Sequence, residues 1–189
     1  MKKILMMAAV ALMLTACGNK NNANNESKDG DSAANTEATG KAEAPATKWT
    51  TYTNEKHGFS VEVPAGLIQR ETMLPDDGTI FSADGEEGIT FNRIDISGHK
   101  DIFDEEYTPE KVKKDFEDWT KNMGDELASK ECGEDYYTYT VKSDIVNELH
   151  MVRYKGTEMV TVVILYEPEN EDMLGGDVAK HVFESIKFK

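Results

Sequence analysis

One long segment near the N-terminus of this 189-residue chain cannot contribute to a hydrophobic core. Residues 18–48 contain no Leu, Ile, Val, Met or aromatic residue and consist mainly of Asn, Ala, Ser, Thr, Gly and Lys. Because burial of apolar side chains offsets the entropy lost on ordering a chain, this segment is expected to be disordered. A coil of this length spans about 30 Å. We therefore expect one folded domain, which begins near Trp49 and includes residues 49–189.

The excess of acidic side chains belongs to this domain. Residues 49–189 carry 31 acidic and 15 basic side chains, and the whole chain has a formal net charge of −15. A folded surface that binds nucleic acid needs a basic patch, and a surface that binds anionic lipid also needs positive charge. The composition therefore argues against both, and we expect no nucleic acid partner.

The first seventeen residues have the organisation of a bacterial lipoprotein signal. Residues 1–3 form a short basic head, residues 4–14 are apolar, and the sequence Leu-Thr-Ala-Cys follows and ends at Cys17. A charged head, an apolar stretch of roughly 7–15 residues and small residues near the cleavage site are typical of secretory signals. The last four residues resemble a lipobox, in which the cysteine receives lipid and becomes the first residue of the mature protein. The alternative is an ordinary signal peptide with a chance cysteine.

The resemblance to lipoproteins implies three segments and a location. Residues 1–16 are the signal peptide, residues 17–48 are a lipidated, disordered tether, and residues 49–189 are the globular domain. Two or more acyl chains anchor a protein stably. We therefore expect the domain to lie outside the cytoplasm at a bacterial cell envelope, held to the membrane by lipid on Cys17. The outer membrane is favoured if the host has one, because Gly18 and not Asp follows the cysteine.

The apolar pattern of the domain predicts an α+β fold with an antiparallel sheet and two packing helices. Strands are predicted over 49–53, 59–63, 79–82, 88–96, 136–142, 149–154, 158–166 and 186–188, and helices over about 109–123 and 172–184. The strand at 88–96 is expected to contain a bulge, because its apolar phase shifts between Phe91 and Ile94. Residues 160–166 are almost wholly apolar or β-branched, which predicts a central strand covered on both faces.

The first helix has clear start signals. Thr108 is a suitable N-cap and Pro109 suits the first helical position. Apolar residues then recur on one face, which is predicted to be buried: Val112, Phe116, Trp119 and Met123. The last helix is expected to bury Leu174, Val178 and Val182.

Both ends of the domain resemble PsbP-like domains. Tyr52 and residues 57–64, with the sequence HGFSVEVP, are similar to the opening motif of that family, and residues 182–188, VFESIKF, are similar to its closing helix and strand. The resemblance follows the order of elements over residues 49–189. It implies an α/β/α sandwich and a tendency to bind partner proteins, and it implies no catalytic residue.

We find no motif of a known catalytic chemistry. A glycine-rich phosphate loop, Gly-x-Ser-x-Gly and His-Glu-x-x-His are all missing from the sequence. The four histidines fall in separate predicted elements, so we expect no metal site and no cofactor. His150 is expected on a sheet face and His181 on an exposed helix surface. Cys132 lies among acidic residues that disfavour its thiolate, so it is expected to be a half-buried structural residue.

The acidic residues support two functional hypotheses. Asp101, Asp104, Glu105 and Glu106 lie beside Phe103, and such a mixture suits a protein interface better than acids alone. We therefore predict that these four residues contact a protein partner of a monomeric, non-enzymatic binding module; the bland alternative is a solvated acidic rim. The other function class is a cell-envelope hydrolase using paired carboxylates. A deep pocket with converging acids would favour the hydrolase, and a shallow groove would favour the binding module.

Overall fold

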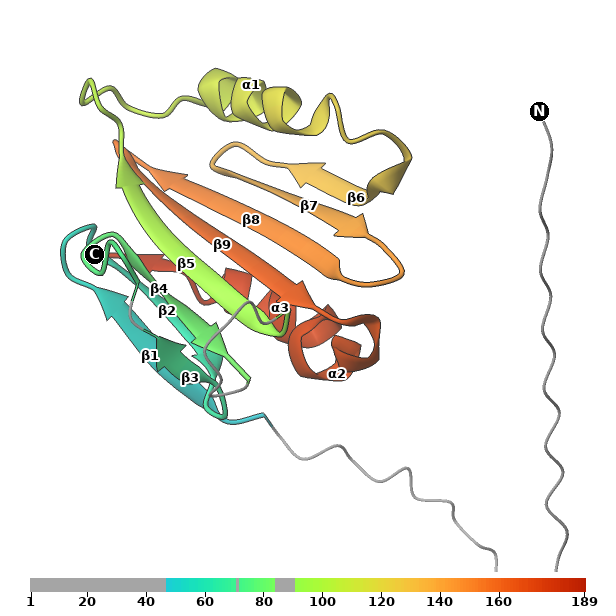
Figure 1. The fold of residues 1–189 in the computed structure, drawn as a ribbon. Helices are drawn as coiled ribbons and strands as arrows, with labels where there is room; N and C mark the ends of the chain where they lie inside the picture. Colours follow the sequence, from blue (N-terminus) through green and yellow to red (C-terminus); the bar gives the residue numbers. More distant parts are fainter. Residues whose placement is uncertain (1–46, 71, 84–90) are drawn as a thin grey trace, which may run out of the picture. The chain divides into compact units, whose positions relative to one another are not determined.

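The computed structural model describes residues 47–70, 72–83 and 91–189 (Figure 1). The predicted signal peptide, the predicted tether as far as residue 46, and Cys17 lie outside these residues. Among the residues that are described, no helix is both long and apolar enough to cross a membrane.

The described residues form strands in consecutive runs, with helices after the fifth strand and after the ninth. The strands are β1 (Trp49–Asn54), β2 (Phe59–Pro64), β3 (Ile68–Arg70), β4 (Gly78–Ser82), β5 (Arg93–Lys100), β6 (Leu127–Cys132), β7 (Tyr136–Lys142), β8 (Asn147–Lys155), β9 (Glu158–Tyr166) and β10 (Lys187–Phe188). The α-helices are α1 (Pro109–Thr120), α2 (Glu171–Leu174) and α3 (Gly176–Glu184), and two 3-10 helices are η1 (Gly124–Glu126) and η2 (Pro168–Asn170).

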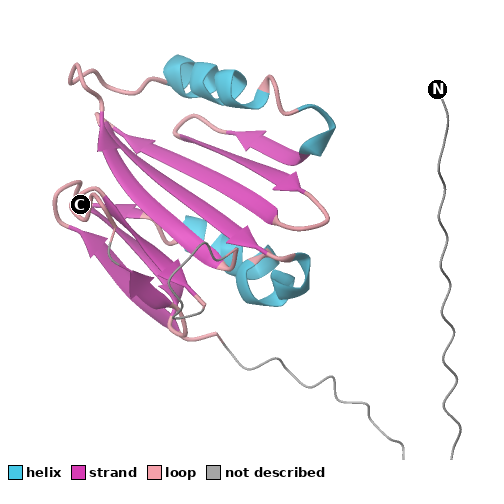
Figure 2. Ribbon diagram, viewed as in Figure 1, coloured by secondary structure: helices cyan, strands magenta, loops and turns pink. Residues whose placement is uncertain are grey.

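The strands make two antiparallel sheets. The larger has seven strands in the order β3-β4-β5-β9-β8-β7-β6, and the smaller has three in the order β1-β2-β10. Helix α1 lies along one face of the large sheet, while α2, α3 and the small sheet lie on the other (Figures 1 and 2). The predicted α+β sandwich, with an antiparallel sheet between packing helices, is therefore confirmed.

Strand β9 occupies the middle of the large sheet, as predicted. Its side chains alternate: Val160, Val162 and Ile164 are fully buried against the small sheet and α3, whereas Thr161 and Val163 are only half-buried. The prediction that both faces are covered is wrong. Helix α1 packs over β6 and β7 and does not extend across the middle of the sheet, so one face of β9 stays partly open.

Helix α1 has the predicted start and a different burial pattern. The hydroxyl of Thr108 accepts a hydrogen bond from the backbone N–H of Lys111 at 3.4 Å. Val112 is buried, but Trp119 is 61% exposed. The prediction that Trp119 is a core residue is wrong, because this side chain lies over the uncovered part of the sheet, where it lines a groove with Thr161.

Three further predictions need correction. Strand β5 begins at Arg93, and its pairing with β9 is continuous, so the predicted bulge is not found there; residues 88–90 lie outside the described part. The last helix is interrupted at Gly175, and Gly176 adopts a φ of 46°, which favours glycine. Val178 is half-buried rather than buried.

Candidate functional site

The predicted acidic contact residues lie in the loop between β5 and α1. The carboxylate of Asp101 accepts hydrogen bonds from the backbone N–H groups of Phe103 at 2.9 Å and Glu105 at 3.1 Å. These bonds, the one from Glu105 foremost, lower the pKa of Asp101 because they stabilise its charged form. Asp101 therefore shapes the loop.

The other three acids of this loop have separate surroundings. Asp104 has a φ of 55° and is paired with Lys100, and Glu105 is paired with Lys111 at 2.8 Å. Glu106 is exposed. The structure therefore does not bring the four carboxylates together into one site. The tip of the loop instead exposes two apolar side chains, Ile102 at 86% and Phe103 at 75%.

A more extensive candidate lies on the face of the large sheet that α1 leaves uncovered. We call this surface the open face and define it by its half-buried residues from three neighbouring strands: Asp95, Ser97, His150, Thr161 and Val163. Val163 pairs with Asp95 on β5 and with His150 on β8. Directly paired residues of antiparallel strands point to the same face, so these side chains form a row across the sheet.

The open face is the floor of a groove with aromatic and apolar borders. Between α1 and the floor lies a cavity of about 390 Å³, at whose edge Trp119 is exposed. A second cavity of about 320 Å³ shares Ser97 and His99 with the first and is bounded by Met73 and Leu74, in the loop before β4. Met73 is 99% exposed and Leu74 is 67% exposed.

Three buried tyrosines form the wall of the first cavity beneath α1: Tyr137, Tyr139 and Tyr154. The hydroxyl of Tyr154 donates a hydrogen bond to Asp115 at 3.2 Å. Burial raises the pKa of Tyr137 to about 12, and burial also raises the pKa of Tyr154. These phenols therefore remain protonated at neutral pH. The ring of Tyr139 stacks on His150 with centroids 4.4 Å apart, which confirms His150 as a sheet-face residue.

Asp95 is a half-buried carboxylate of the open face and lines the second cavity. Its neighbours on either side in the same row are Ile80 and Val163. Arg93 Nε lies 3.1 Å from its Oδ1 and donates a hydrogen bond to its Oδ2 at 3.2 Å. Oδ1 is buried and accepts no well-directed hydrogen bond. Burial is the main cause that raises the pKa of Asp95, and the charge of Glu148 acts in the same direction.

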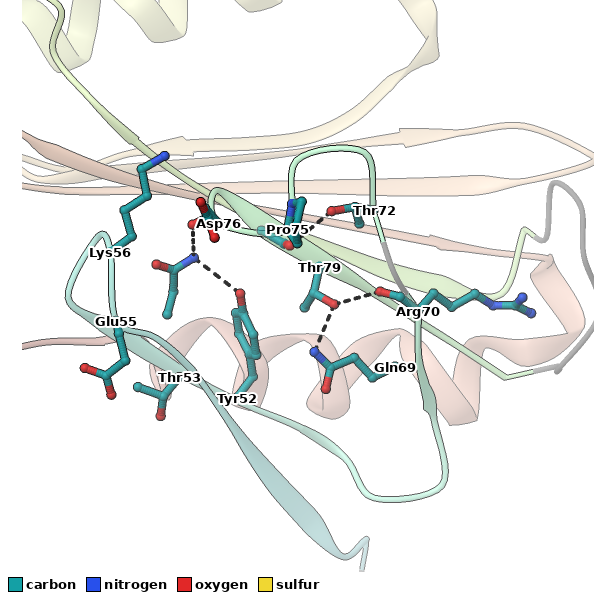
Figure 3. A pocket seen from close by; sticks show the side chains of 12 residues that line it. Tyr52, Thr53, Glu55, Lys56, Gln69, Arg70, Thr72, Pro75, Asp76 and Thr79 are labelled. Carbon is teal, nitrogen blue, oxygen red and sulfur yellow. Dashed lines mark hydrogen bonds between the residues drawn. The ribbon is translucent and has the colours of Figure 1, made fainter.

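A separate cavity of about 440 Å³ lies between the β1–β2 hairpin and the segment around β3 and β4 (Figure 3). Its polar side chains bond to one another: Asn54 donates to the carbonyl of Asp76 at 3.0 Å and to Tyr52 at 3.3 Å, and Thr79 donates to the carbonyl of Arg70 at 3.1 Å. Because these groups already have partners, we assign the network a structural role in joining the hairpin to the large sheet.

Two residues differ from their expected surroundings. His181 was predicted to lie on an exposed helix surface, but its ring stacks on Trp49 at 3.8 Å and its Nε2 bonds to Glu62 at 2.7 Å. Cys132 was predicted to be half-buried, but it is exposed, because β6 is an edge strand of the sheet. Within the described residues, no three His, Cys, Asp or Glu side chains are placed to hold a metal ion.

No family model and no curated protein matches this sequence. Among solved structures, the cyanobacterial PsbP protein (CyanoP) of Synechocystis aligns with 77% of this chain and 95% of its own, at 16% identity and a TM-score of 0.52. The chain has a PsbP-like fold. A protein of Bacteroides thetaiotaomicron aligns with 74% of this chain and 48% of its own, at 11% identity and a TM-score of 0.50. The Ran-binding protein Mog1p of Saccharomyces cerevisiae aligns with 76% of this chain and 96% of its own, at 12% identity and a TM-score of 0.48.

The open face could not be predicted from the sequence. Its residues come from β5, β8 and β9 and meet only through the register of the sheet. The one signal that could have indicated it is the polar residue Asp95 between the apolar residues Ile94 and Ile96, in a strand whose opposite face is core.

Proposed function

We propose that this protein is a lipid-anchored binding module, outside the cytoplasm, whose open face holds a segment of an envelope protein. The observation that carries the proposal is the exposure of Trp119 at the edge of a groove with a half-buried floor. Tryptophan and tyrosine are enriched among the residues that contribute most to protein binding, particularly beside pockets that exclude water. A bound segment would cover both the indole ring and the floor.

The borders of the groove fit the same proposal. Four strongly exposed apolar residues belong to the loops that precede β4 and follow β5: Met73, Leu74, Ile102 and Phe103. Because β4 and β5 are antiparallel neighbours, the start of β4 and the end of β5 lie at the same end of the sheet. Exposed apolar side chains near a groove with polar residues are typical of protein interaction sites.

Anchoring through Cys17 is the second part of the proposal and is supported by the lipobox order in the sequence. The first strand begins at Trp49, at the end of the molecule far from the loop between β5 and α1 (Figure 1). The point of attachment and this loop therefore lie at opposite ends of the domain. Replacing Cys17 by Ser should leave the precursor uncleaved or release a soluble form, which membrane fractionation and mass spectrometry would detect.

The test of binding uses a photo-crosslinking amino acid in the full chain, in its own envelope. Placed at position 119, it should capture a discrete protein, and placed at Ile145, an exposed apolar position in the turn between β7 and β8, it should not. Trp119→Ala should lower capture from a neighbouring crosslinking position, His99, by at least tenfold, since a hot-spot residue contributes about 2 kcal/mol. Equal capture at positions 119 and 145 would contradict the proposal.

The alternative, a cell-envelope hydrolase, would have to use Asp95 and Glu148. This pair is favoured by one observation, the raised pKa of Asp95, to which the charge of Glu148 contributes. A carboxyl group whose pKa is raised by burial and by a neighbouring charge is a candidate for proton transfer. If the protein hydrolyses envelope glycans, Asp95→Asn and Glu148→Gln should each abolish the activity, whereas Trp119→Ala should retain it.

A further inference from the structure

We propose that Asp95 recognises a lysine or arginine side chain of the segment that binds the open face. The inference rests on the proposed function and adds the chemistry of the bound residue. The carboxylate receives the charged head of that side chain, and the cavity beside it receives the apolar stem.

The position of Asp95 is costly for the unbound protein. It stands between Ile80 and Val163 in the same row, and 30% of its side chain is exposed. A carboxylate with apolar neighbours loses hydration that only hydrogen bonds or an opposite charge can replace. The core on the other face of β5 does not require a polar residue here, since Ile94 and Ile96 supply its contacts.

The hydrogen bonds that Asp95 makes do not saturate it. An ionised carboxylate has about four lone-pair positions. Arg93 Nε donates to Oδ2 and lies 3.1 Å from Oδ1, but Oδ1 receives no well-directed hydrogen bond. Oδ1 itself is buried, so a ligand would reach the exposed part of the carboxylate through the adjoining cavity. A cationic donor there would add a second charged partner to the one that Arg93 supplies.

The cavity beside Asp95 suits a long apolar stem with a charged end. Its volume is about 320 Å³, and Met73, Leu74 and Ile80 are among the residues that line it. Lysine and arginine bury their methylene groups along apolar surface while the head reaches a polar partner. An acidic head group would be repelled by the carboxylate of Asp95, and a neutral one would not compensate its charge.

The remaining charged groups of the open face leave Asp95 available for a cation. His150 is bonded to Glu148, and Asp115 accepts from Tyr154. Asp77, which also lines the cavity, is paired with Lys56 at 2.5 Å. With the net charge of −15 on the chain, the electrostatic field favours a basic ligand over an acidic one.

The experiment compares two small probes on the full mature chain, with Cys17 replaced by Ser to keep it soluble. The probes are the N-acetyl, N′-methylamide derivatives of lysine and of norleucine, which share a stem and differ in the charged head. Amide NMR titration should show shifts at Asp95, Ser97 and Val163, with the norleucine probe at least fivefold weaker. Asp95→Asn should reduce the affinity for the lysine probe to that for the norleucine probe.

Asp144→Asn is the matched control, because this exposed acid in the turn between β7 and β8 gives the same change in net charge. It should leave both affinities unchanged. Equal binding of the two probes to the unaltered protein, or equal effects of Asp95→Asn and Asp144→Asn, would overturn the inference. The first comparison needs no variant at Asp95, so it holds even if Asp95→Asn fails to fold. Capture at position 119 tests the proposed function separately. If Asp95→Asn still captures the partner and the two probes bind equally, the recognition of a basic residue is contradicted while the proposed binding function stands.

Discussion

The Nδ1 atom of His57, in the turn between β1 and β2, lies 3.0 Å from the carboxylate of Glu158 at the start of β9. Its Nε2 lies 3.1 Å from Asp77, and only 9% of the histidine side chain is exposed. One imidazole therefore joins the small sheet to two segments of the large sheet. The histidine opens the HGFS sequence that resembles the PsbP-like motif, and the structure gives it a role in joining the sheets.

Replacing His57 by Ala should lower the free energy of unfolding by about 1–3 kcal/mol. The change leaves two partly buried carboxylates without their shared partner. Urea denaturation would measure it. His99→Ala is the control, because His99 is exposed and its ring bonds to the hydroxyl of Ser97 two residues away. Its effect should stay within about 0.5 kcal/mol. Equal losses in both variants would show that the contacts of His57 add little.

Gly98 should tolerate no side chain. A Cβ there would lie 2.6 Å from the ring of Phe59 and 2.8 Å from His57, so Gly98→Ala should cost about 1–3 kcal/mol through overpacking. Gly66→Ala is the matched control, since nothing lies within 4 Å of a Cβ at that position. Thermal unfolding of the two variants would separate the effects, and a melting temperature for Gly98→Ala as high as that of Gly66→Ala would contradict this packing.

The success of the sequence predictions follows from which interactions are local. The start of α1 depends on Thr108 and Pro109, which act within one turn, and it was predicted correctly. Strands β3 and β6 were not predicted, because Ile68–Arg70 is only three residues long and Leu127–Cys132 is a polar edge strand, exposed almost throughout. Their pairing partners, and not their own patterns, make them strands.

The candidate site was harder to predict than the fold for the same reason. The helical spacing places Trp119 on the same face of α1 as Val112, as predicted. Whether that face is covered depends on which strands lie below it. The acids at residues 101–106 were adjacent in sequence, yet the structure gives them separate local partners. Convergence on the open face comes from strands far apart in the chain.

Reversing Asp104, Glu105 and Glu106 to Lys should slow association with a partner captured through position 119. Exposed charges near an interface mainly accelerate encounter, and salt screens them over about 8 Å at physiological strength. The ion pairs that the reversal breaks are exposed, so thermal stability should change little. Surface plasmon resonance at two salt concentrations would measure the rate. An unchanged rate at low salt would show that these acids are only a solvated rim.

The tether should be dispensable for folding. A chain of residues 49–189 should unfold at the same temperature as residues 17–189, because residues 18–48 contain no side chain suited to a core. One backbone contact lies at the boundary, where the carbonyl of Lys48 accepts from the N–H of Ala65 at 2.9 Å. Calorimetry of the two chains provides the comparison. A decrease of more than a few degrees in the shorter chain would mean that the tether packs on the domain.

Asp95 should lower the stability of the fold as it ionises. Burial raises the pKa of this carboxyl above its value in the unfolded chain, so the folded state binds more protons than the unfolded state between the two values. The free energy of unfolding therefore falls as the pH rises through that interval, from about 4 upward.

Asparagine does not titrate. The free energy of unfolding of Asp95→Asn, minus that of the unaltered protein, should increase with pH over this range and then level off. Loss of the contact with Arg93 shifts this difference by a constant amount once both side chains are charged. Urea denaturation from pH 3.5 to 7 would measure it, with Asp144→Asn as the exposed control. A difference that stays flat or decreases would show that Asp95 is not destabilised by ionisation, and the argument that a basic ligand relieves this cost would fail with it.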